Sequence, residues 1–322
     1  MRTLNRRAFI QQTTLILAAG PALLPANVGF SADMKNRRMT MDLVCGAIGV
    51  SANQREAAEL AARHGFESVG ADGGYLAGLS AGQLADFQGW MKEKKVVFGA
   101  AGLGLEFRQD QSKFEEGLKT LPGIAAGSHR AGVDRMGTWL MPSSRTMTYV
   151  QNFRQHTARL REVAKILKDH GVRLGLEYVG PKTSWASSRY PFIHTLGELK
   201  ELISEIATGN VGVVLDSWHW WNAGDTVEDL LALKAADVVA VDLNDAPAGI
   251  PKEQQADGRR ELPCATGVID VAAFFNALNQ IGYDGPVRVE PFNQVVNKMS
   301  REEACAAAAT SLRKAFALLE TK

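Results

Sequence analysis

Cysteine is scarce in this sequence, which has three in 322 residues, at positions 45, 264 and 305. An odd number of widely spaced cysteines excludes a small domain held together by disulfides. No Cys-x-x-Cys pair is present, so a thiolate metal site is also excluded. We therefore expect the cysteines to act as packing residues and any metal to be held by other side chains.

An excess of charge of either sign is also missing. The chain has 36 Lys and Arg against 35 Asp and Glu, a net charge of +1, and the part beyond the N-terminus has no basic run. A nucleic-acid partner or an anionic membrane surface is therefore not expected. Because 46% of the residues are hydrophobic, the chain can build a large core. A small-molecule partner is the expectation, and homo-oligomer formation is left open.

Long hydrophobic runs are absent except near the N-terminus. There "NRRAFI" places Arg6 and Arg7 ahead of the short apolar stretch "TTLILAAGPALLP". This arrangement resembles a twin-arginine export signal, with residues 1–32 as the signal and cleavage near Ala32. The resemblance implies a periplasmic protein exported after folding, which suits an enzyme loaded with its metal in the cytoplasm. It also implies no membrane contact after cleavage.

From Thr40 onward, short apolar runs alternate with segments of helical periodicity. The eight runs are "MDLVCGAIG", "FESVGAD", "KVVFGAAG", "VDRMGTWL", "VRLGLEYVG", "VGVVLD", "VVAVDLND" and "PVRVEPF". Eight β-then-α units predict a single (β/α)₈ TIM barrel over residues 40–318. A doubly wound sheet is the alternative, but its best feature, the G-x-x-G-x-G of residues 99–104, lacks the dinucleotide-binding order.

Acidic residues follow four of the apolar runs where the predicted strands end. They are Glu177, Asp216, Asp242 and Glu290, and Asn244 and Asp245 lie beside the third. In a barrel, successive strand ends converge on one mouth, where the chemistry of the fold takes place. Carboxylates at close range repel one another and raise each other's pKa unless a cation lies among them. The pattern therefore predicts a divalent metal site.

The stretches "GLEYVGP", "VGVVLDSWHWWNAG", "VVAVDLNDAP", "GVID" and "GYDGPVRVEPF" resemble the sugar phosphate isomerase/epimerase family of xylose-isomerase-like barrels, which includes ketose 3-epimerases and inosose-processing enzymes. The resemblance covers roughly Thr40 to Leu318. It implies a metal held by Glu, Asp, His and Glu, with the two glutamates acting as acid and base. Glu177, Asp216 and Glu290 match three ligand positions, and His219 matches a substrate-binding histidine.

The fourth ligand position departs from the family, because Asp242 in "VDLND" stands where a histidine is usual. The set of Glu177, Asp216, Asp242 and Glu290 offers only oxygen and is formally −4. Oxygen ligands favour Mn²⁺, Mg²⁺ or Ca²⁺ over Zn²⁺. Mn²⁺ is the expected metal, with Mg²⁺, Co²⁺ or Zn²⁺ as alternatives, and a weakened or redirected site is the other interpretation of Asp242.

Residues next to these acids are candidates for binding a sugar. They are His219, Trp139, Trp218, Arg259 and Arg260. Indole rings offer apolar faces to a sugar ring, although packing under the loop is the alternative for Trp218. Arg259 or Arg260 lies in a long loop after the seventh strand, where substrate selection is common, and a surface ion pair is the alternative for both.

These features predict a metal-dependent isomerase or epimerase that removes a proton next to a sugar carbonyl, through an enediolate. Loss of a leaving group from the β carbon would instead make the protein a lyase on a 3-keto-glycoside. A non-catalytic sugar-binding barrel is a third interpretation. A hydrolytic nuclease is disfavoured by the missing histidines and the missing basic charge.

Overall fold

The structure is a computed structural model that describes residues 37–319. The predicted export signal, residues 1–32, lies outside this part. Among the described residues, none of the helices combines the length and the hydropathy that crossing a lipid bilayer requires.

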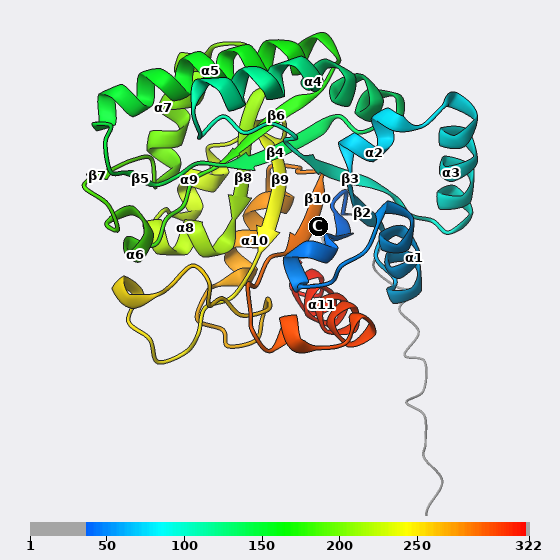
Figure 1. Cartoon of the computed structure of the whole chain (residues 1–322). Helices are drawn as coiled ribbons and strands as arrows, with labels where there is room; N and C mark the ends of the chain where they lie inside the picture. Colours follow the sequence, from blue (N-terminus) through cyan, green and yellow to red (C-terminus); the bar gives the residue numbers. More distant parts are fainter. Residues whose placement is uncertain (1–36, 320–322) are drawn as a thin grey trace, which may run out of the picture. The chain divides into compact units, whose positions relative to one another are not determined.

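The described residues form a closed barrel of eight parallel strands (Figure 1). The strands are β1 (Thr40–Leu43), β2 (Ser68–Ala71), β3 (Val97–Gly102), β4 (Arg135–Trp139), β6 (Arg173–Glu177), β8 (Val211–Asp216), β9 (Val238–Leu243) and β10 (Pro286–Val289). Their order around the barrel is β1-β10-β9-β8-β6-β4-β3-β2, and the pairing of β1 with β10 closes the ring. Each predicted apolar run overlaps one of these strands, so the TIM-barrel prediction is confirmed and the doubly wound alternative is wrong.

Helices connect the strands and cover the outside of the barrel (Figure 1). The α-helices are α1 (Gln54–His64), α2 (Gly73–Gly78), α3 (Ala81–Glu93), α4 (Gln111–Arg130), α5 (Tyr149–Asp169), α6 (Lys182–Trp185), α7 (Leu196–Ile206), α8 (Ser217–Ala223), α9 (Val227–Leu231), α10 (Val271–Gln280) and α11 (Arg301–Phe316). Capping residues set many helix starts. The Thr148 side chain accepts from the amide of Gln151 while the Gln151 side chain accepts from the amide of Thr148.

The remaining elements are short. They are two strands that pair in antiparallel fashion, β5 (Ser143–Ser144) and β7 (Tyr190–Pro191), and four 3₁₀ helices, η1 (Cys45–Ile48), η2 (Ala235–Asp237), η3 (Lys252–Gln254) and η4 (Val296–Lys298), all within residues 37–319. Cys45 therefore lies in a 3₁₀ helix just after β1, and within the described part all three cysteines are unpaired.

The barrel interior is filled below the mouth. Val214 and Ala240 precede Asp216 and Asp242 by two residues, so they point inward one layer lower, and they pack with Ala100 as a small apolar cluster. This layer supports the acidic residues from beneath and places them at the carboxyl ends of the strands.

Candidate active site

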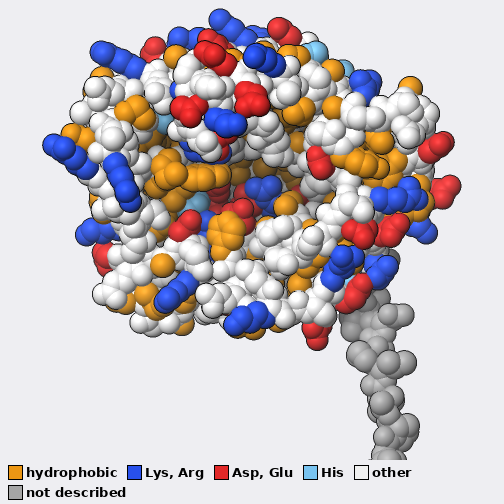
Figure 2. Space-filling model, viewed as in Figure 1, with side chains coloured by type: hydrophobic (Ala, Val, Ile, Leu, Met, Phe, Trp, Pro, Cys, Tyr) orange, Lys and Arg blue, Asp and Glu red, His pale blue; other side chains and the backbone are white. Residues whose placement is uncertain are grey.

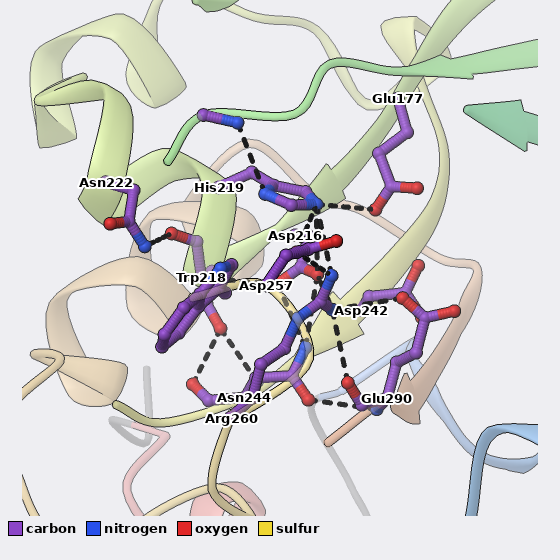
Figure 3. A network of polar contacts seen from close by, with 12 residues as sticks. Glu177, Asp216, Trp218, His219, Asn222, Asp242, Asn244, Asp257, Arg260 and Glu290 are labelled. Atoms are coloured by element: carbon purple, nitrogen blue, oxygen red, sulfur yellow. Dashed lines mark hydrogen bonds and ion pairs between the residues drawn. The ribbon is translucent and has the colours of Figure 1, made fainter. Parts of the chain in front are cut away.

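The four predicted carboxylates lie together at the mouth (Figure 3). Glu177 is the last residue of β6, Asp216 is the last of β8, Asp242 lies in β9, and Glu290 directly follows β10. One ligand atom each from Glu177, Asp242 and Glu290 lie within 4.8 Å of one another, and Glu177, Asp216 and His219 form a second such group. The structure therefore brings together residues that are up to 113 positions apart, from 177 to 290.

A guanidinium group lies among these acids. Arg260 donates from Nη1 to Asp216 Oδ2 at 2.6 Å and to Glu290 Oε2 at 3.0 Å, and from Nη2 to Asp257 Oδ1 at 2.8 Å. Its side chain is almost fully buried, whereas that of Arg259 is exposed. Of the two predicted arginines, Arg260 points into the site and Arg259 does not. Sequence reasoning missed Asp257 as a member of the site.

A second arginine, which the sequence analysis did not identify, neutralises Asp242. Arg288 is the register partner of Asp242 across β9 and β10. Its Nε and Nη2 donate to the two oxygens of Asp242, the second at 2.9 Å. Asp242 is fully buried and the Arg288 side chain is 21% exposed. The residue that replaces the usual histidine is thus half of a neutral ion pair.

Burial changes the acid strength of the cluster. It raises the pKa of Glu177 well above the ordinary range, and the charges of Glu290, Asp242 and Asp216 raise it further. Burial likewise raises the pKa of Asp216 to about 7, against the opposing effect of Arg260. Burial also raises the pKa of Glu290. All three carboxyl groups therefore hold a proton at higher pH than an exposed acid does.

The donor set fits a divalent metal. The four clustered carboxylates, Asp257 and two guanidinium groups together have a formal charge of −3, which one divalent cation would largely balance. Glu177 Oε1 is buried and has no hydrogen-bond partner among the described residues. A buried oxygen of this kind costs free energy unless something binds it.

His219 faces the same space from α8 (Figure 3). The backbone amide of Gly180 lies 3.3 Å from Nδ1, and Nη2 of Arg260, which can only donate, lies 3.3 Å from Nε2. Burial lowers the pKa of His219 to about 3, and the charge of Arg260 contributes. Nε2 lies 3.8 Å from Glu177 Oε1 and 3.9 Å from Asp216 Oδ2. His219 is therefore a neutral imidazole that lies between two donors, with Nε2 beside the acids.

The acids open into a pocket of about 530 Å³. Its lining includes Glu177, His219, Asp257, Arg260 and Glu290 at one end and Trp139, Met141, Pro142, Val179 and Phe292 along the wall. Trp139, a predicted sugar-binding residue, therefore lines the pocket. Trp218 is fully buried and does not line the pocket, which is the packing alternative for this residue.

One further acid, Asp42 of β1, lies inside the barrel. Neither of its oxygens has a hydrogen-bond partner of normal geometry among the described residues. A Cβ at Gly99 would lie 2.4 Å from Asp42 Oδ1, so only glycine leaves room for this carboxyl group. Burial raises the pKa of Asp42 to about 6, against the effects of Ser68 and Arg288.

Asp42→Asn is therefore expected to change how stability depends on pH. Because the pKa of Asp42 is higher in the folded than in the unfolded protein, the protonated carboxyl group stabilises the fold at pH values below about 4. This stabilisation is lost as the pH rises through about 6. Asparagine does not ionise, so the variant does not lose this stabilisation. The difference in free energy of unfolding between variant and wild type should therefore shift by about 3 kcal/mol in favour of the variant between pH 3.5 and pH 7.5. Denaturant melts of the metal-free proteins measure the difference. The exposed control Asp86→Asn should show none, and a constant offset for Asp42→Asn would contradict the assignment.

Comparison with known proteins places the chain in a family. Residues 58–321 match the family described as Xylose isomerase-like TIM barrel, and the chain belongs to this family. Inosose isomerase of Bacillus subtilis is 32% identical over 152 residues, which are 45% of this chain and 49% of that protein. The chain thus matches about half the length of this curated relative. Inosose isomerase of Bacillus velezensis is 24% identical over 79% of this chain and 88% of that protein.

Solved structures agree with the fold. A xylose isomerase domain protein from Alicyclobacillus acidocaldarius is 30% identical, covers 87% of this chain and 99% of its own, and has a TM-score of 0.76. The IOLI protein, solved with a bound zinc atom, is 22% identical over 88% of this chain and all of its own, with a TM-score of 0.72. At that identity the likeness shows the fold alone.

Proposed function

We propose that this protein is a metal-dependent sugar isomerase or epimerase that moves a proton on the carbon next to a carbonyl group. The observation that carries the proposal is a buried glutamate, Glu177, and a half-buried one, Glu290, both with raised pKa values, which face one pocket together with the neutral ring of His219. The similarity to inosose isomerases supports it. The substrate class is a small sugar.

We assign each residue of the site a role in this proton transfer. One glutamate, ionised, takes the carbon-bound proton, and the other, protonated, returns a proton, giving an epimer or the isomeric carbonyl compound. His219, whose neutral ring borders the pocket, would contact a carbonyl or hydroxyl group of the substrate. Arg260 holds Asp216 and Glu290 in place. Glu177, Asp216, Asp242 and Glu290 would hold the metal, with Mn²⁺ proposed for this all-oxygen set, and a metal there supplies charge that polarises the carbonyl.

Three measurements test the proposal together. Saturating Mn²⁺ should raise the melting temperature and a chelator should lower it, because ligands that bind the folded state stabilise it by mass action. Elemental analysis of the purified protein should detect a divalent metal. Exchange of substrate C–H protons in D₂O, tried over a panel of ketoses and 3-keto-glycosides, should then identify the reacting class.

The outcomes separate the three interpretations. Exchange with return of an epimer or isomer supports the proposal, whereas release of an aglycone would make the protein a lyase. Binding without exchange would make it a sugar-binding barrel. No metal and no thermal shift in either direction would remove the metal from the mechanism. Assembly into a homo-oligomer stays a prediction.

We also propose export to the periplasm by the twin-arginine route, which rests on Arg6, Arg7 and the apolar stretch after them. Changing both arginines to lysine should leave the protein in the cytoplasm, as judged by fractionation of cells expressing the full chain. Arg38→Lys, outside the signal, is the matched control. Unchanged periplasmic yield of the double variant would refute the proposed route.

A further inference from the structure

The pocket lining combines charged, hydroxyl and apolar side chains. The charged and hydroxyl residues other than His219 are Glu177, Asp257, Arg260, Glu290, Ser143, Thr183, Ser184 and Ser187. Among the apolar lining residues, Trp139, Met141 and Phe292 are 40%, 44% and 38% exposed. They are three of the ten large hydrophobic side chains that are exposed in the described part of the chain. Exposed apolar side chains gathered in a concave site indicate a ligand-binding surface.

The two aromatic rings face the mouth from opposite sides. Trp139 ends β4, and Phe292 follows β10. In the closed ring, β9, β8 and β6 separate these strands on one side and β1, β2 and β3 on the other. Figure 2 shows hydrophobic side chains above and below the hollow, with charged side chains between them. Trp139 is also the register partner of Glu177, and Phe292 lies two residues after Glu290. Each ring is therefore positioned next to one of the two glutamates by the backbone.

Each ring is supported by an arginine. The guanidinium carbon of Arg108 lies 4.6 Å from the centroid of the Trp139 ring, and Arg108 Nη1 donates to the Trp139 carbonyl at 2.6 Å. The guanidinium carbon of Arg260 lies 4.6 Å from the centroid of the Phe292 ring. These contacts fix the planes of both rings before any ligand binds.

Phe292 is held in an unfavourable backbone conformation. Its φ is +42°, in the left-handed region that bulky side chains avoid. Hydrogen bonds hold this turn, with the Arg260 amide donating to the Pro291 carbonyl at 3.1 Å and Asn293 Nδ2 donating to the Arg260 carbonyl at 3.0 Å. Strained residues of this kind persist mainly where a site needs them.

We propose that the pocket binds a substrate of two linked groups, a sugar ring at the acids and a second ring, the aglycone, between Trp139 and Phe292. The inference rests on the proposed function for the reacting end. The volume of about 530 Å³ lies in the range of pockets for multi-ring ligands. Within the described lining, Arg260 is the one cationic side chain, and Asp216, Asp257 and Glu290 share its charge. The substrate is therefore an uncharged glycoside rather than a sugar phosphate.

The test measures binding and needs no turnover. The probes are p-nitrophenyl β-glucoside and methyl β-glucoside, titrated calorimetrically into the full, metal-loaded protein. Wild type should bind the p-nitrophenyl compound about 10-fold tighter, which corresponds to about 1.4 kcal/mol. Trp139→Ala and Phe292→Ala should each remove most of this preference while changing the affinity for methyl β-glucoside less than 2-fold.

Three further variants make the result decisive. Trp139→Phe keeps a ring and should keep most of the preference, and Val295→Ala, an exposed residue outside the pocket lining, should keep all of it. Phe292→Gly suits the positive φ, so it tests the ring without disturbing the turn and should lose the preference as Phe292→Ala does. Equal binding of the two probes by wild type, or a preference that survives in all three ring-removing variants, would overturn the inference. Because no chemistry is involved, absence of C–H exchange would overturn the proposed function alone.

Discussion

Replacing Asp242 by histidine alone is expected to destabilise the protein, although histidine is the usual residue of the family at this position. Asp242 accepts from both Nε and Nη2 of Arg288 and is fully buried. Histidine would leave the Arg288 charge without its partner in a site where four-fifths of that side chain is buried. Removing one partner of a buried ion pair costs about 3–5 kcal/mol, so chemical denaturation should show a loss of this size.

The double variant Asp242→His with Arg288→Leu should recover most of this loss. It replaces a neutral ion pair with a neutral imidazole and an apolar side chain, and substitutions of that kind are often neutral or stabilising. Unfolding measurements on both single variants and the double variant give the coupling energy directly. The double variant should also bind Zn²⁺ or Co²⁺ more tightly than wild type, because nitrogen is a softer donor. Wild-type stability in the single Asp242→His variant would show that Arg288 does not depend on Asp242.

The barrel and its acidic residues could be predicted from the sequence because both depend on local patterns. Each apolar run ends at its own polar residue, and the carboxyl ends of parallel strands meet at one mouth. Glu177, Asp216 and Glu290 follow from that rule without knowledge of any contact. The pairing of Asp242 with Arg288 depends on the register of β9 and β10, which are separated in the chain by a long loop and helix α10. The alternation in "VRVE" does place Arg288 on the same side of its strand as Glu290, and this signal could have found it.

Side chains in the loops were harder to place. Arg259 and Arg260 are adjacent and carry the same charge, so only tertiary contacts decide which one turns inward. The amide of Arg260 donates to the Pro291 carbonyl, and this contact fixes its direction. Trp218 and His219 are neighbours in α8, where successive residues point about 100° apart, so one packs in the core while the other faces the pocket. The sequence does not show how the helix is rotated.

Glu177→Gln and Glu290→Gln are each expected to lower turnover by about 10²-fold or more, because glutamine keeps the size and an oxygen ligand but cannot accept the proton. Metal content should fall less than turnover. Glu253→Gln, in the loop outside the pocket lining, is the matched control and should behave as wild type. The measurements are elemental analysis and C–H exchange in D₂O, on whichever ketose or 3-keto-glycoside wild type exchanges.

The two variants should differ in their metal-free stability. Burial and the neighbouring acids raise the pKa of Glu177, so its stabilising contribution is present at low pH and is lost as the pH rises through that raised value. Glutamine resembles the protonated form, and the metal-free Glu177→Gln protein should therefore melt at a higher temperature than wild type at pH 8, with the difference shrinking toward pH 4. Glu290→Gln should gain less, because Glu290 Oε2 accepts from Arg260 at 3.0 Å and the substitution removes that ion pair. Full exchange activity in both variants would show that neither glutamate is the base, and His219, whose Nε2 lies 3.8 Å from Glu177, would then have to take the proton.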